Sequence, residues 1–232
     1  MNEGSLKICI WSGPLAGLLF VIGLWPLAHF IPLLDPLYSA GQVAAIYQSN
    51  TIGIRLGGIA IMFSASFNAA FFGAIYVFIK RIEDDRGPYA VTQALSGAVL
   101  VAFIFLPAML FTVTAFRPER PVELTLLMND FAWLALVIPT PPGIVQALAV
   151  GFAILSDRSP EPLLPRWAGY MSLWVAVLTI PAPLAVMFKA GPFAWNGSLA
   201  FWMPACIAGL WLVVMTVAML RSARRAASAD TP

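Results

Sequence analysis

The sequence predicts an all-α fold, a polytopic membrane helix bundle of six transmembrane helices in which proline breaks the fourth and fifth helices. Three observations indicate this class. The 232 residues are 60% hydrophobic and only 10% charged, and their mean hydropathy of +0.86 lies far outside the range of soluble globular domains. Six apolar runs are long enough to cross a bilayer, which takes about 20 helical residues. Two of these runs are interrupted by clustered prolines.

The first span covers residues 8–31. This run is too long for the apolar core of a signal peptide, and no small-residue cleavage pattern follows it, so we interpret it as a membrane helix. Gly13, Gly17 and Gly23 give one of its faces small residues, which allow neighbouring helices to approach closely.

A short amphipathic helix is expected between the first two spans. Ser39 can cap a helix over residues 40–48, whose apolar and polar side chains separate onto two faces. We expect this helix to lie on the membrane surface. The second span then covers residues 53–79. The third covers residues 89–116, because Pro88 stands where proline suits the start of a helix.

The fourth span, residues 129–155, carries the clearest local signal in the chain. Pro139, Pro141, Pro142 and Gly143 lie near its middle. Proline removes a backbone donor and clashes with the preceding turn, so a regular α-helix is not expected to continue through this cluster. Such a break either shapes helix packing or lines a binding site near the centre of the bilayer.

The last part of the chain completes the bundle. The fifth span covers residues 167–188 and contains two further prolines, and the sixth covers residues 198–220. Residues 1–220 therefore form a single six-helix transmembrane domain. The tail of residues 221–232 is basic and then small and polar, so we expect it to be disordered and cytoplasmic.

The distribution of basic residues predicts the orientation of the six spans. Most of the 13 Lys and Arg residues lie on segments that share a side with the two termini. The exceptions are Arg55, Arg117, Arg120 and Lys189. Because Lys and Arg are enriched on the cytoplasmic side, we expect a multi-pass protein of the cytoplasmic (inner or plasma) membrane with both termini cytoplasmic.

This orientation gathers polar and aromatic residues at the outer ends of the spans. Asp130 is expected in the first turn of its helix, where the helix dipole favours a carboxylate, and next to arginines with which it can pair. The cluster is either an ion-pair network at the surface or the mouth of a ligand pocket floored by the proline breaks. The candidate ligand-binding residues are Arg55, Asn68, Arg117, Arg120, Asn129, Asp130, Trp133, Gln146, Trp195 and Asn196.

Several kinds of site are not indicated. His29 is the only histidine, and Cys9 and Cys206 lack metal-ligand spacing, so we expect no metal site, haem or Ser-His-Asp relay. The chain contains no P-loop, GxGxxG, GxSxG or HExxH motif, and we expect no cofactor. Its basic residues are dispersed, which argues against nucleic acid as a partner.

Three functions fit these features. We favour a protein that binds or transports a small apolar or amphipathic molecule, because two helices are interrupted and the central parts of the spans lack charge. The alternative is a membrane enzyme acting on a lipid, isoprenoid or steroid-like substrate, with Asp130 or Glu123 as acid or base and an arginine stabilising charge. The third is a non-catalytic subunit of a membrane complex. The expected partners are membrane lipids, the apolar ligand, and a second copy or a complex subunit; catalytic residues stay unassigned.

Overall fold

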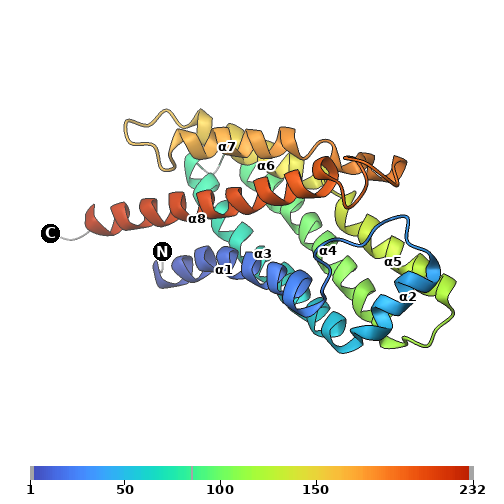
Figure 1. Cartoon of the computed structure of the whole chain (residues 1–232). Coiled ribbons are helices and arrows are strands. Elements are labelled where there is room, and N and C mark those ends of the chain that lie inside the picture. Colours follow the sequence, from blue (N-terminus) through green and yellow to red (C-terminus); the bar gives the residue numbers. More distant parts are fainter. Residues whose placement is uncertain (1–2, 85, 230–232) are drawn as a thin grey trace.

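The computed structural model describes residues 3–84 and 86–229, and these ranges contain helices and no strands. Within them, six helices are long and apolar enough to cross a membrane, which confirms the predicted class. Figure 1 shows that they pack side by side and that the N- and C-terminal segments lie at the same end of the bundle. We call this the termini end, and the opposite end, where α2 and α5 lie, the far end.

The helices have the following bounds. The α-helices are α1 (Glu3–Ile22), α2 (Ala40–Ser49), α3 (Thr51–Ile82), α4 (Tyr89–Phe116), α5 (Val122–Val137), α6 (Pro141–Ser156), α7 (Arg166–Leu178) and α8 (Met203–Ala229). Short segments of different pitch extend the spans, namely the π-helical η1 (Gly23–Leu27) and η3 (Ser198–Trp202) and the 3-10 segment η2 (Ala182–Met187).

The proline breaks are present, and they bend the helices only mildly. The fourth span consists of α5 and α6, which together cover 35 residues. Ile138 and Thr140, which flank the break, keep right-handed helical dihedral angles. Pro141 then occupies the first position of α6, where the missing N–H group is not needed. The fifth span breaks between α7 and η2 in the same way, next to Pro181.

The fourth span begins earlier than the sequence suggested. Pro121 precedes the first residue of α5, Val122, so Asn129 and Asp130 lie about two turns inside the helix. The expectation that Asp130 occupies the first turn was therefore wrong, and the acidic residue in that position is Glu123. Asn129 and Asp130 only lower the local hydropathy, whereas the helix itself begins directly after Pro121. Asp130 consequently gains no support from the helix N-terminus.

The amphipathic helix after the first span is confirmed as α2. Ser39 and Gln42 form a reciprocal capping box, in which the Ser39 N–H donates to Gln42 Oε1 at 2.8 Å and the Gln42 N–H donates to Ser39 Oγ at 3.4 Å. The apolar side chains Val43, Ala44 and Tyr47 are buried, and α2 packs mainly on α5. The apolar face of α2 is therefore directed at protein.

Two of the three glycines of the first span lie at close helix contacts. A Cβ atom on Gly23 would stand 2.7 Å from the Gly57 carbonyl oxygen, and one on Gly57 would clash with the Gly23 carbonyl. Gly13 faces the ring of Phe71 just as tightly, while a Cβ on Gly17 would meet only Leu212, at 3.8 Å. The backbones of η1 and α3 thus touch at a point where only glycine fits.

The last helix extends beyond the predicted sixth span. α8 runs to Ala229, so it continues past Leu220 into the segment for which we expected disorder, and residues 230–232 lie outside the described ranges. Arg225 Nη2 donates to the carbonyl of Leu163 at 3.3 Å, which ties this extension to the loop between α6 and α7.

We predict that Gly57→Ala destabilises the protein, because the added methyl group pushes the backbones of η1 and α3 apart. Overpacking of this kind costs about 1–3 kcal/mol. The measurement is the midpoint of thermal unfolding in a mild detergent. Gly209→Ala on α8 is the control, because a Cβ there meets nothing within 4 Å and alanine favours helix. Equal midpoints for the two variants would contradict the close crossing.

Candidate functional site

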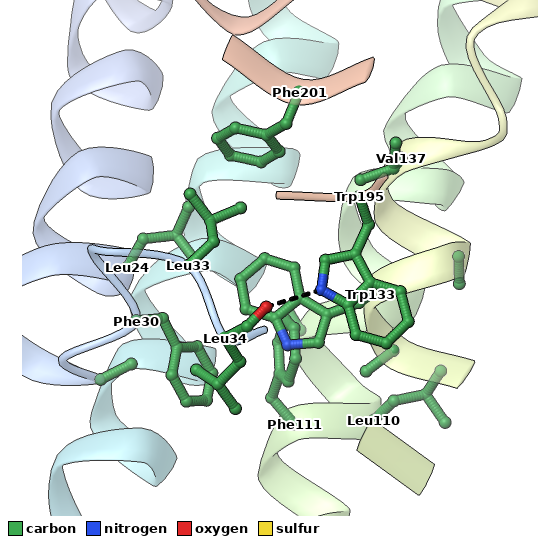
Figure 2. Close-up of a cluster of buried hydrophobic side chains, with 14 of the residues drawn as sticks. Leu24, Phe30, Leu33, Leu34, Leu110, Phe111, Trp133, Val137, Trp195 and Phe201 are labelled. Carbon is green, nitrogen blue, oxygen red and sulfur yellow. Dashed lines mark hydrogen bonds between the residues drawn. The ribbon is translucent and has the colours of Figure 1, made fainter. Parts of the chain in front are cut away.

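Aromatic side chains fill the core of the far half of the bundle. Trp133 of α5 is fully buried, and its ring centroid lies 5.5 Å from that of Phe30, 5.1 Å from Phe111 and 6.5 Å from Phe201. Tyr47 of α2 lies 6.0 Å from Phe30. Figure 2 shows Phe30, Phe111 and Phe201 around Trp133. We call these five residues the aromatic cluster. They occupy the region in which the sequence suggested a pocket.

A row of polar groups runs through this core along one face of α5. Thr125, Asn129 and Trp133 are four residues apart in turn, which places them on the same side of the helix, and each is at most 1% exposed. We call this row the buried polar face of α5. Asn129 Oδ1 accepts a hydrogen bond from the Tyr47 hydroxyl at 3.2 Å, and Asn129 Nδ2 lies 3.4 Å from Asp130 Oδ1.

The other two members of this face are unsatisfied. Among the described residues, Thr125 Oγ1 and Trp133 Nε1 are the buried side-chain nitrogen and oxygen atoms that lack a hydrogen-bond partner. Each such group costs about 1–3 kcal/mol. The other buried tryptophans are paired, since Trp195 Nε1 donates to Leu34 O at 2.8 Å and Trp211 Nε1 donates to Ser172 Oγ at 2.8 Å.

The Thr125 hydroxyl also differs from those of three other threonines in the membrane helices. Thr112, Thr114 and Thr216 each donate to the carbonyl four residues earlier, at 2.7 Å, which is the usual solution for a threonine within a membrane helix. The equivalent acceptor for Thr125 is the carbonyl of Pro121, which the Thr125 N–H already contacts at 3.2 Å. The hydroxyl itself does not take this bond.

Tyr47 is held as a neutral phenol. Burial raises its pKa strongly, the negative charge of Asp130 raises it further, and the Thr114 hydroxyl offsets a small part of this increase. The protonated hydroxyl is therefore available as a donor to Asn129 at any physiological pH.

The far end is covered by irregular segments, residues 28–39 and 188–197, together with α2. We call this the far-end cap. The bond between Trp195 Nε1 and the Leu34 carbonyl, drawn in Figure 2, joins its two irregular segments. Two bonds join α2 to its neighbours: Gln48 Nε2 donates to Pro118 O at 3.0 Å, and the Tyr47 hydroxyl donates to Asn129 Oδ1 at 3.2 Å. The cap thus contributes Phe30 and Tyr47 to the aromatic cluster, and a small number of hydrogen bonds holds it against the rest of the bundle.

The expected pairing of Asp130 with an arginine was wrong. Arg55 Nε and Nη2 instead donate to the carbonyls of Ala115 and Phe116 at 2.9–3.1 Å, where the last turn of α4 lacks intrahelical donors. Arg117 is exposed and Arg120 is half-buried. Within residues 3–84 and 86–229, no ion pair links Asp130 to these arginines, and the cation whose charge acts on it is Lys189.

The remaining candidates lie in other surroundings. Asn68 Nδ2 donates to Ser64 O at 3.2 Å within its own helix. Gln146 is buried between α4 and α6, where its Nε2 lies 3.4 Å from Gln93 Oε1. Asn196 is half-buried in the cap next to Trp195. The structure therefore brings together Asn129, Trp133 and Trp195, with Asp130 beside them, and separates the others.

Sequence reasoning missed Thr125 as a site residue. Its spacing from Asn129 and Trp133 indicates a shared helix face only when the helix begins at Val122, and not at residue 129 as the hydropathy suggests. The phenylalanines of the aromatic cluster gave no such signal, since they come from separate parts of the chain.

No family model, curated protein or solved structure matches the chain. In the part of the chain that the structure describes, no group of three or more His, Cys, Asp or Glu side chains is arranged to hold a metal ion. The functional argument therefore rests on the far-end geometry.

We predict that Tyr47→Phe lowers the free energy of unfolding by about 1–2 kcal/mol, because it leaves the buried Asn129 Oδ1 without its donor. Chemical unfolding in a mild detergent measures the change. Tyr38→Phe is the matched control, since Tyr38 is exposed and its replacement should have an effect within about 0.5 kcal/mol. In the background of Asn129→Leu, Tyr47→Phe should lose most of its effect. A Tyr47→Phe variant as stable as wild type would show that this bond does not hold α2 to α5.

Proposed function

We propose that the protein binds a small, largely apolar or amphipathic molecule against the buried polar face of α5. The observation that carries the proposal is the pair of unpartnered groups, Thr125 Oγ1 and Trp133 Nε1, on one helix face, whereas the other buried side-chain nitrogen and oxygen atoms of the described residues have partners. An unpaired buried polar group reduces stability. Two of them on the same face are accounted for if a ligand supplies the missing partners.

The groups define the chemistry of that ligand. An indole N–H group can only donate, so the ligand needs an acceptor such as a carbonyl or ether oxygen near Trp133. A threonine hydroxyl can donate or accept. The surrounding rings of the aromatic cluster favour an apolar or aromatic body. Because the cluster contains no ionisable group other than the neutral Tyr47, the buried part of the ligand is uncharged.

Access to this face requires the far-end cap to move. The cap contains two irregular segments, and irregular surface segments open at lower free energy than packed helices. The polar contacts that would part include Trp195–Leu34, Gln48–Pro118 and, where α2 leaves α5, Tyr47–Asn129. If the ligand can also reach this face from the bilayer or from the termini end, the protein transports the ligand rather than only binding it.

We further propose that the protein lies in the cytoplasmic membrane with its termini end in the cytoplasm. The basic residues at this end support the orientation, whereas the far end carries Arg55, Arg117, Arg120 and Lys189. The ligand would then enter from the outer side.

We expect the protein, purified in nanodiscs, to retain a neutral apolar molecule with an oxygen acceptor. Native mass spectrometry with organic extraction identifies it. Trp133→Phe keeps an aromatic ring, removes the N–H donor and reduces the side-chain volume, so affinity for the identified molecule should fall at least about 2- to 10-fold, the equivalent of one hydrogen bond. Trp174→Phe is the control, because Trp174 is 59% exposed.

A second variant separates binding from stability. Thr125→Val removes an unpaired hydroxyl, so it should leave the ligand-free protein equally stable or more stable while weakening ligand binding. Bare wild-type protein, together with a destabilised Thr125→Val variant, would refute the binding site and would favour a structural subunit.

For the orientation, we expect a cysteine at Glu119 in the far-end loop to react with a membrane-impermeant maleimide in intact cells. A cysteine at Glu161, in the loop at the termini end, should react only after permeabilisation. Both positions are exposed, and both variants are made in a background with Cys9 and Cys206 replaced by alanine. The reverse labelling pattern would invert the proposed topology.

A further inference from the structure

A second candidate site lies on the lateral surface of the bundle, in a groove between α3 and α4. The groove has a volume of about 290 Å³, and its lining is Ala69, Phe72, Gly73, Tyr76, Ala94 and Ala98. A Cβ atom on Gly73 would meet nothing within 4 Å, so the space beside this residue is open. Because α3 and α4 are both membrane-spanning by length and hydropathy, the groove faces the lipid.

The floor of the groove is firmly held. Gln93 Nε2 of α4 donates to the Phe72 carbonyl of α3 at 3.0 Å. Gly97 allows α4 to approach so closely that a Cβ there would stand 2.8 Å from the Phe72 ring. The two helices therefore cannot close over the hollow that their small residues leave. The groove is a preformed shape, and its narrow apolar channel suits a flexible hydrocarbon chain.

A basic group stands at the end of the groove toward the termini end. One helical turn beyond Tyr76, which lines the groove, Lys80 Nζ lies 5.9 Å from the Tyr76 ring centroid. Arg81 follows on α3. Tyrosine and lysine at a helix end are typical of the headgroup level of a bilayer.

We propose that this groove binds one acyl chain of an anionic phospholipid, whose phosphate lies at Lys80 and Arg81. The occupant is indicated by the combination of an apolar channel at membrane depth with positive charge at one end. A negatively charged headgroup complements that charge, and the open side of the groove admits a chain from the bilayer. The site is separate from the buried polar face of α5.

The proposal is tested with delipidated protein in a nonionic detergent, to which dioleoyl-phosphatidylglycerol or dioleoyl-phosphatidylcholine is added. Native mass spectrometry counts the retained lipid, and thermal unfolding gives the shift in midpoint. Wild type should bind the anionic lipid more tightly. Lys80→Gln should lower the affinity for phosphatidylglycerol about fivefold, the effect of one basic residue near a charged surface. The affinity for phosphatidylcholine should stay unchanged.

Filling the groove should abolish retention of both lipids. Gly73→Leu fills the groove from α3, and Ala98→Leu fills it from α4. If one variant fails to fold, the other still tests the proposal. Gly209→Leu adds the same side chain at an open, exposed position on α8 and should retain lipid like wild type. Equal lipid retention by Gly73→Leu, Ala98→Leu and Gly209→Leu would overturn the proposal. So would equal affinity of wild type for the two lipids, or loss of a protein dimer in the groove variants with lipid retention unchanged.

Discussion

The far half of the bundle depends on the hydrogen bond from the Tyr47 hydroxyl to Asn129 Oδ1. It joins α2 to α5 across 82 positions of sequence, inside an otherwise aromatic core. Because both groups are buried, the bond fixes where α2 lies along α5, and thereby how Tyr47 meets Phe30 and how Phe30 meets Trp133. An apolar contact between the two helices would tolerate small shifts along the axis. A buried polar pair does not, since each atom needs its partner.

Against this well-satisfied pair, the two unpaired groups of α5 form a consistent exception. The indole nitrogens of Trp195 and Trp211 both donate hydrogen bonds. The hydroxyls of Thr112, Thr114 and Thr216 each donate to a carbonyl of their own helix. Valine at 125 would fill similar space without an unpaired atom, and phenylalanine at 133 would keep an aromatic ring without one. Residues that reduce stability at no structural gain occur most often where function requires them. This contrast within one chain supports a ligand at α5.

Much of the fold could be predicted from the sequence, because hydropathy and proline chemistry act locally. The six spans, the break at Pro141 and the Ser39 cap of α2 all follow from such local signals. The candidate site could be predicted only in part. Hydropathy placed the start of the fourth span at Asn129, and this error hid Thr125.

Partners set by tertiary packing were beyond the sequence. A guanidinium at a span end can satisfy either a carboxylate or the open carbonyls of a helix C-terminus. Because α4 packs beside α3, the Arg55 guanidinium donates to the carbonyls of Ala115 and Phe116. At the other end of α4, the same helix pair is locked by Gln93 and Gly97 against Phe72. The lateral groove therefore belongs to the rigid part of the bundle, and the far-end site lies under its most irregular part. A lipid in the groove would reinforce the α3–α4 scaffold without contacting the cap, so the two sites have no structural reason to compete.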